Sequence, residues 1–335
     1  MLKKDISLLI LILVIGTITG FLNPRFVSAI NLSNTANLIG LFGLYAIGSG
    51  FVIIVGGIDL SVGAMFALLG VIFIDLLSNY EMNWVLALVL MVLAGGLLGA
   101  LHAFLIVRMG LQAFIVTLCG LLLYRGIARW YTGDGTAGFQ FGQNFPTLEW
   151  LTTGRTWGVP HSFVTFLVVA AIMAVVLHRS VFGRYLYAVG KNEEAARYSG
   201  IRTGAVIAAA YVIAGLLAGL SSIYFAMYTR SIAPASHGNF YELYGIAAAV
   251  LGGCSLRGGE GSVLGIVLGA VLLQILQNLV NLLGIPSSLN FAVMGAVILI
   301  GVLADEQYAR FQLWRRSGAR VAPGLLPGAA KETDS

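Results

Sequence analysis

An acidic residue among glycines is the first candidate for a functional role in this chain of 335 residues. Asp59 lies in the segment Gly-Gly-Ile-Asp-Leu-Ser-Val-Gly at residues 56–63. A carboxylate at a helix start accepts backbone N–H bonds and suits the helix dipole, which makes Asp59 an N-cap candidate. In an apolar stretch it can also gate or line a polar path, and paired glycines let a helix break there. Both interpretations stay open, and the second extends to Gly56, Gly57 and Ser61.

A second candidate is the segment 179–204, where charged and polar residues interrupt the apolar pattern. Asn192 is a suitable N-cap, Glu193 and Glu194 fall in the first turn, and Gly200 can end the helix. The pattern predicts a helix of about two turns whose charged ends and small central residues suit a groove in a partner protein. A solvated connecting loop is the alternative. The residues assigned to docking are Gly190, Asn192, Glu193, Glu194, Ala195, Ala196, Ser199 and Gly200.

Polar side chains inside apolar runs form a third set. They are Ser49, Asn278 and Asn281, with Gln274 and Gln277 on the same predicted helix as the two asparagines. In lipid such groups either hydrogen-bond to a neighbouring helix or offer hydroxyls and amides to a polar solute. His102, also inside an apolar run, has the same two interpretations.

The sequence lacks the motifs of several enzyme classes. It has no Gly-x4-Gly-Lys-Ser/Thr loop for ATP, no zinc-ligand spacing and no Gly-x-Ser-x-Gly nucleophile elbow. Its two cysteines, Cys119 and Cys254, sit in apolar runs and form no disulfide framework. We therefore expect neither a catalytic centre, nor a metal site, nor a cofactor.

The composition indicates that these residues are carried by membrane helices. The chain is 59% hydrophobic and 10% charged, with a mean hydropathy of +0.92, whereas soluble domains carry about 25% charged residues. Because this chain has too few charged residues to cover the water-exposed surface of a soluble protein of its size, we predict an all-α polytopic membrane protein. The net charge of +5 fits loops that face anionic lipid better than a nucleic-acid site.

Ten apolar runs approach the roughly 20 residues that cross a bilayer. They are Ile6–Leu22, Leu38–Gly56, Leu60–Ile74, Trp84–Val107, Leu111–Tyr131, Ser162–Leu177, Ala205–Tyr228, Leu243–Leu256, Ser262–Leu283 and Leu289–Leu303. A cleaved signal peptide is the alternative for the first run. We predict a transmembrane domain over residues 1–310 and a disordered cytoplasmic tail over residues 311–335.

The basic residues predict the orientation of these spans. If the N-terminus is inside and the spans alternate, 14 of the 19 Lys and Arg residues lie inside. The five outside are Arg25, Arg125, Arg129, Arg155 and Arg230. This bias follows the positive-inside rule, so both termini and the segment 179–204 are expected in the cytoplasm.

Four ordered blocks of this sequence resemble the ribose-type sugar permeases of bacterial ABC importers. The first is residues 56–63, and the second is Ala-Phe-Ile-Val-Thr-Leu at 113–118 followed by Tyr-Arg-Gly at 124–126. The third runs from Phe182-Gly183-Arg184 to Ser-Gly-Ile at 199–201, and the fourth is the glycine-rich stretch 251–261. Gln112 and Cys254 stand where proline and threonine are usual in the family.

The resemblance implies a permease for a monosaccharide, a ribose-like pentose or related sugar, in the bacterial inner membrane. It implies three partners: a separate ABC ATPase subunit, a periplasmic sugar-binding protein, and a second permease copy or paralogue. The helix after Asn192 would then be the coupling helix that sits in the ATPase. An ion-coupled secondary transporter, with Asp59 as its carboxylate, is the alternative, and a membrane enzyme or scaffold is a third.

Overall fold

The computed structural model describes residues 2–286 together with residues 289, 292, 295–296 and 299. The chain separates into two compact units, Met1–Phe291 and Ala292–Ser335, and every element below belongs to the first. The tail 311–335 and most of the predicted span Leu289–Leu303 lie outside the described residues.

Seven helices in the described part of the chain are long and apolar enough to cross a membrane. They are α1 (Leu2–Leu22), α2 (Ala29–Ile54), α4 (Trp84–Ala103, continued by the π-helical turn η2, Phe104–Arg108), α5 (Ala113–Tyr131), α7 (His161–Arg179), α10 (Thr203–Thr229) and α12 (Val263–Leu282). Each overlaps one of the predicted runs. Two further runs form shorter apolar helices, α3 (Val62–Ser78) and α11 (Tyr241–Leu251). The chain is thus an all-α multi-pass membrane protein, while the total of ten spans stays a prediction.

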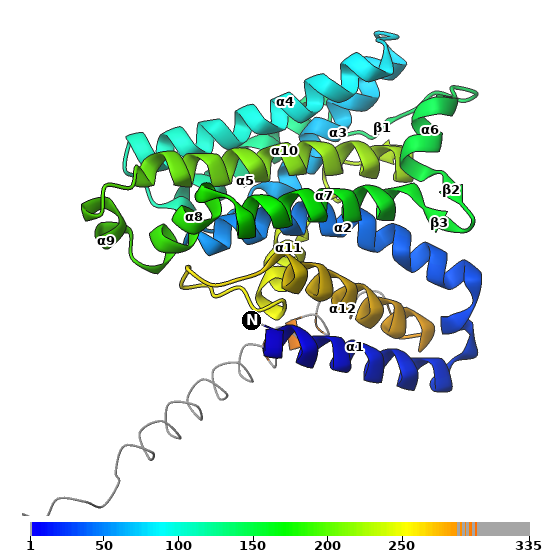
Figure 1. Cartoon of the computed structure of the whole chain (residues 1–335). Coiled ribbons are helices and arrows are strands. Elements are labelled where there is room, and N and C mark those ends of the chain that lie inside the picture. The colour runs from blue at the N-terminus through cyan, green and yellow to red at the C-terminus, as the bar shows by residue number, and fades with distance from the viewer. Residues whose placement is uncertain (1, 287–288, 290–291, 293–294, 297–298, 300–335) are drawn as a thin grey trace, which may run out of the picture. The chain divides into compact units, whose positions relative to one another are not determined.

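The shorter elements gather at opposite ends of the long helices (Figure 1). One end carries α8 (Val181–Lys191) and α9 (Glu193–Tyr198). The other end carries α6 (Pro146–Thr153), the hairpin of β2 (Arg155–Thr156) and β3 (Val159–Pro160), and the pair formed by β1 (Ala137–Gly138) and β4 (Ser231–Ile232). A 3-10 turn, η1 (Pro24–Val27), links α1 to α2.

Helix α2 lies at the centre of the unit and α1 at its edge. In the membrane-length stretch of α2, 89% of the residues are buried, whereas in that of α1 only 11% are buried. Helices α7, α10, α11 and α12 all pack against α2. Because α2 presents glycines to them, the contacts are close: a Cβ on Gly40 would lie 2.5 Å from the Ser162 carbonyl carbon.

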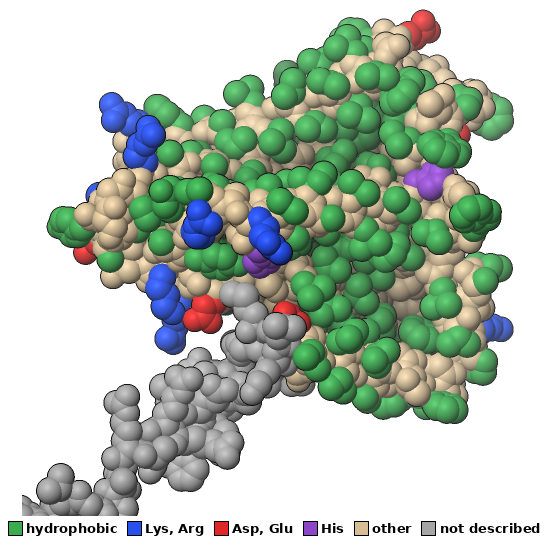
Figure 2. Space-filling view, viewed as in Figure 1, with side chains coloured by type: hydrophobic (Ala, Val, Ile, Leu, Met, Phe, Trp, Pro, Cys, Tyr) green, Lys and Arg blue, Asp and Glu red, His purple; other side chains and the backbone are tan. Residues whose placement is uncertain are grey.

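Helices α4 and α10 pack closely along their length. A Cβ on Gly95 would collide with the carbonyl oxygen of Gly215, and one on Gly219 would lie 2.7 Å from that of Met91. This seam is the tight glycine packing expected where lipid provides no hydrophobic force between helices. On the face shown in Figure 2, hydrophobic side chains cover much of the long helices, and most of the Lys and Arg side chains lie toward the end that bears α8 and α9.

Candidate functional site

Helix α9 is capped as the sequence indicates. The Asn192 Oδ1 accepts a hydrogen bond of 2.9 Å from the Ala195 N–H, and Gly200 follows the helix with φ +82°. The Glu193 carboxylate accepts from Arg197 Nη2 at 2.8 Å and from Thr203 Oγ1 at 3.1 Å. Since Thr203 is the first residue of α10, this carboxylate ties α9 to the start of a long helix.

The other predicted docking residues lie on or next to α9. Glu194 and Ala195 are exposed, Ala196 is buried beneath the helix, and Ser199 forms its C-cap. Gly190 lies one turn earlier, on α8, where it packs against the end of α2. The exposed face of α9 is therefore free to contact another protein, while its buried side rests on the bundle.

Sequence reasoning treated α8 as part of a loop. Its N-cap is Ser180, whose Oγ accepts from the Gly183 N–H at 3.0 Å. Gly183, Leu186 and Val189 form its buried face at a spacing of three residues. That spacing, together with the serine cap, was the available signal for this amphipathic helix.

Asp59 organises the turn between α2 and α3. Its side chain is 4% exposed, and Oδ1 accepts from the Ser61 N–H at 2.8 Å and from the Ser61 hydroxyl at 2.7 Å. Ser61 is the N-cap residue of α3, so Asp59 fixes the residue that precedes the helix rather than capping the helix itself. Gly56, with φ +88°, ends α2 before this turn.

Two other helices hold the Asp59 turn through hydrogen bonds, and α4 places a buried histidine nearby. Thr117 on α5 and Tyr211 on α10 each donate to the Ile58 carbonyl oxygen at 3.3 Å. Tyr211 also covers Gly57, because a Cβ there would lie 2.6 Å from the Tyr211 hydroxyl. On α4, His102 is 1% exposed and its Nε2 pairs with the Tyr124 hydroxyl at 2.9 Å. Sequence reasoning named His102 but did not group these residues.

The predicted path residues have different environments. Ser49 is 3% exposed, faces α11, and its Oγ has no hydrogen-bond partner among the described residues. The Asn278 amide instead joins α12 to α2, donating to Asn31 Oδ1 at 2.9 Å and to Thr35 Oγ1 at 2.7 Å. Asn281, near the end of α12, is exposed. Ser49 thus offers an unused hydroxyl, whereas Asn278 makes an interhelical bond.

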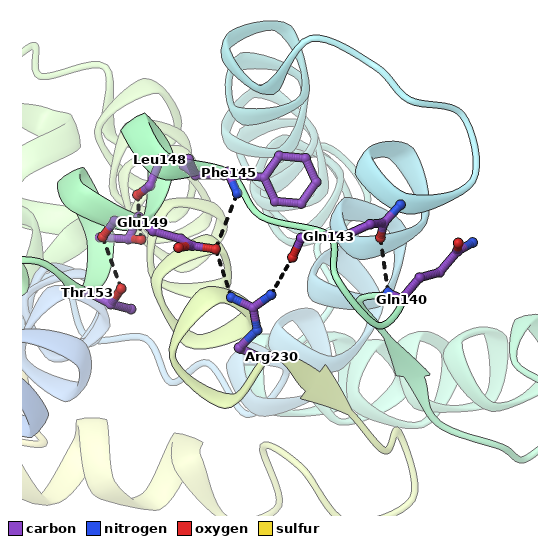
Figure 3. A network of polar contacts seen from close by, with 8 residues as sticks. Gln140, Gln143, Phe145, Leu148, Glu149, Thr153 and Arg230 are labelled. Carbon is purple, nitrogen blue, oxygen red and sulfur yellow. Dashed lines mark hydrogen bonds and ion pairs between the residues drawn. The ribbon is translucent and has the colours of Figure 1, made fainter.

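A polar network that the sequence did not reveal closes the opposite end of the bundle (Figure 3). Arg230, which follows α10 with φ +57°, donates to Glu149 Oε1 and to the Gln143 carbonyl oxygen, both at 2.7 Å. Burial alone would raise the pKa of Glu149, but hydrogen bonds from Arg230 and the Phe145 N–H outweigh it, so the pKa lies below its ordinary value. The network fastens α6 to the end of α10.

Within the described residues, no three His, Cys, Asp or Glu side chains gather as a metal site would require. No solved structure matches the chain.

Several known proteins that are similar to the chain are transport permeases. The ribose import permease RbsC of Escherichia coli K12 is 37% identical over 305 residues, 91% of this chain and 93% of that protein. The D-allose transport system permease AlsC of the same strain is 32% identical over 88% of this chain and 89% of its own. The autoinducer 2 import system permease LsrC of Escherichia coli O9:H4 is 31% identical over 92% of each.

A family model described as "Branched-chain amino acid transport system / permease component" matches residues 31–302, which is most of the chain. The match includes α2 to α12 and therefore the Asp59 turn, α8 and α9. The chain thus belongs to this family of transport permease components, and within it to the ribose-type permeases of ABC importers.

Proposed function

We propose that this chain is the membrane-spanning permease subunit of an ATP-driven importer for a monosaccharide, a ribose-like pentose or related sugar. The observation that carries the proposal is 37% identity to a ribose import permease along nearly the whole length of both chains. The relatives also include permeases named for D-allose, fructose and autoinducer 2. The family therefore accepts several polar solutes, and we assign the final choice of sugar to a periplasmic binding protein.

The energy for uptake comes from a separate ABC ATPase subunit. A sugar is neutral, so the membrane potential does no work on it, and the chain has no ATP-binding loop of its own. We assign α9 to docking into the ATPase. Within it the exposed residues Glu194 and Ala195 are assigned to the contact, and the adjacent Gly190 and Ser199 are assigned to the same docking region. Support comes from its exposed charged face and from the Glu193 bond to Thr203, through which movement of α9 reaches α10.

The orientation follows from the basic residues. Lys and Arg gather at the end that bears α8 and α9 (Figure 2), which supports a cytoplasmic position for that end. We place both termini in the cytoplasm too, and the sugar-binding protein at the end with α6. A second permease copy or paralogue completes the complex.

Two groups in the bundle are assigned to the path and its gate. Ser49 has a buried hydroxyl free to bond a passing sugar or water. The turn that contains Gly56, Gly57, Asp59 and Ser61 connects α2 to α3 at the end near α8, and we assign this turn to gating. For Asn278 and Asn281 a contact with the sugar stays a prediction.

The decisive experiment is reconstitution in liposomes with and without the ATPase and the binding protein. Uptake should require ATP and both partners. The double charge reversal Glu193→Lys with Glu194→Lys should retain insertion but lose sugar uptake per ATP hydrolysed. Glu81→Lys, a reversal at an exposed residue between α3 and α4 and therefore far from α9, is the control and should keep the wild-type ratio of sugar transported per ATP hydrolysed. Uptake by the chain alone, driven by a cation gradient, would instead establish the ion-coupled secondary transporter.

A further inference from the structure

Two turns of the bundle share one cap geometry. Helix α2 is followed by Gly56 with φ +88°, and α11 by Gly253 with φ +87°. In both, the next N–H reaches back five residues: Gly57 N to Val52 O at 2.8 Å and Cys254 N to Ala249 O at 2.9 Å. These are Schellman caps, and each precedes the helix that returns through the bundle, α3 or α12.

The segment 255–261, which follows the α11 cap, meets the end of α2 at α8, and the contacts are between backbone atoms. The Gly259 N–H donates to the Ile54 carbonyl oxygen at 2.8 Å. A Cβ on Gly190 would collide with that same oxygen, and one on Gly258 would lie 2.6 Å from Gly190 O and 3.0 Å from the Gly56 Cα. With no side chain between them, the end of α2, the end of α8 and the turn 255–261 cannot slide past one another without breaking contact.

Two side chains fasten this junction from α8. The Tyr187 hydroxyl donates to the Gly261 carbonyl oxygen at 2.7 Å, and Lys191 Nζ lies 3.1 Å from Glu260 Oε1. The Lys191–Glu260 pair is exposed and therefore weak. Tyr187 is half-buried, and burial raises its pKa to about 12, so the hydroxyl keeps its proton at neutral pH. The Tyr187 hydrogen bond is thus the main side-chain contact that holds the turn 255–261 against α8.

We propose that Tyr187 is a positioning residue that makes α8, α9 and the turn 255–261 move as one body with the end of α2. This inference rests on the proposed docking of the ATPase at α9. A displacement of α9 then reaches the Asp59 turn directly through Gly190 and Ile54, and reaches the start of α12 through Gly259 and Gly261. The glycine-rich turn after α11 becomes part of the coupling machinery without itself having to bind the ATPase.

The test compares Tyr187→Phe with Tyr185→Phe in the reconstituted transporter with its ATPase and binding protein. Tyr185 lies on the same helix with its ring exposed, so it is the matched control. Loss of one net hydrogen bond shifts an equilibrium roughly fivefold toward the open junction. Tyr187→Phe should lower the sugar transported per ATP while ATP hydrolysis continues, and Tyr185→Phe should leave the ratio unchanged. Gly190→Ala should have the larger effect, because its Cβ enters the Ile54 carbonyl.

Cys254 reports the junction independently of transport. It is 3% exposed beneath Gly261, and burial raises the pKa of its thiol to about 12, so maleimide labelling in a Cys119→Ser background should be slow. Tyr187→Phe should speed this labelling roughly fivefold. A normal transport ratio in Tyr187→Phe overturns the inference, whether or not Cys254 opens. The docking proposal fails separately, if the Glu193 and Glu194 reversals leave coupling intact.

Discussion

Asp59 shows how one buried side chain can build a turn inside a membrane protein. Its Oδ1 satisfies both the N–H and the hydroxyl of Ser61, and so sets the residue from which α3 starts. The sequence predicted that Asp59 accepts N–H bonds from the first turn of α3. In the structure it instead accepts from Ser61, the N-cap residue of that helix. This bonding leaves the gating role as a proposal that a mutation series can separate from structure.

Asp59→Ala should lower the free energy of unfolding in detergent by about 1–3 kcal/mol, because the buried Ser61 N–H loses its acceptor and the Ser61 hydroxyl keeps only the weak acceptor Met65 Sδ at 3.5 Å. Asp59→Asn keeps an oxygen acceptor and should cost less. Thermal unfolding of both variants measures this, and sugar competition assays should show unchanged substrate preference. If Asp59→Asn were as damaging to uptake as Asp59→Ala while unfolding normally, the charge itself would matter, which is the behaviour of an ion-coupled carrier.

Glu149 gives the Arg230 network at the α6 end a defined pH dependence. Its pKa is lower in the folded protein than the ordinary value of 4.5, so the Arg230 pair stabilises α6 above that pH and weakens as the pH falls through the lower folded value. Above about pH 4.5, backbone hydrogen exchange of residues 146–153 should therefore be slower in the wild type than in Glu149→Gln. This difference should shrink as the pH falls below that value. Equal exchange in both proteins across the titration would contradict this.

At the scale of elements, the seam between α4 and α10 can be tested with matched glycines. Gly95→Ala places a Cβ in the Gly215 carbonyl and should cost about 1–3 kcal/mol in unfolding free energy. Gly126→Ala, on α5, has no heavy atom within 4 Å of its new Cβ and should be neutral or slightly stabilising. Thermal unfolding of the two in detergent should rank them in this order; equal stability would show that the seam tolerates separation.

The sequence predicted helix positions where apolar runs coincide with helices, and missed boundaries where polar residues are satisfied across helices. The run expected from Leu38 begins at Ala29 in the structure, because Asn31 bonds Asn278, and Ser33 donates to the Gly158 carbonyl at 2.6 Å. Conversely, the run expected to end at Leu256 stops at Leu251, where the Gly253 cap closes α11.

The candidate site was predictable only in part, for a similar reason. Local signals identify α9, since Asn192 and Gly200 lie next to the helix that they bound. Contacts between distant segments leave no such local signal. The junction of Gly190 with Ile54 and Gly259, the Tyr211 bond to Ile58, and the Arg230 network all join residues far apart in the chain.

At the scale of the whole unit, α10 is one of the helices that touch both ends. Its first residue, Thr203, bonds Glu193 of α9, and Arg230 directly after it holds Glu149 of α6. Between them the glycine seam joins α10 to α4. If α9 docks the ATPase as proposed, we expect its displacement to reach, through this helix pair, the surface to which we assign the binding protein. This arrangement depends on the two ends lying on opposite sides of the membrane.

That requirement can be tested by thiol labelling in a Cys119→Ser, Cys254→Ser background. Trp157, at the hairpin tip, is 99% exposed and Tyr198, on α9, is 92% exposed, and only α7 among the membrane-length helices separates them. A membrane-impermeant maleimide added to intact spheroplasts should label Trp157→Cys, and should label Tyr198→Cys only after permeabilisation. Labelling of Tyr198→Cys in intact spheroplasts would invert the orientation and remove α9 from the reach of any cytoplasmic ATPase.

The same assay decides whether α3 crosses the membrane. Its 17 residues span about 26 Å, slightly less than the roughly 30 Å of the hydrocarbon core. However, its carboxyl end meets the segment before α6, which we place outside, since the Gln143 amide donates to the Ser78 carbonyl oxygen at 3.1 Å. Glu81→Cys, just beyond α3, should therefore label from outside together with Trp157→Cys. If it labelled only after permeabilisation, α3 would be a re-entrant helix, and the even number of crossings that puts the N-terminus and α9 on one side would be lost.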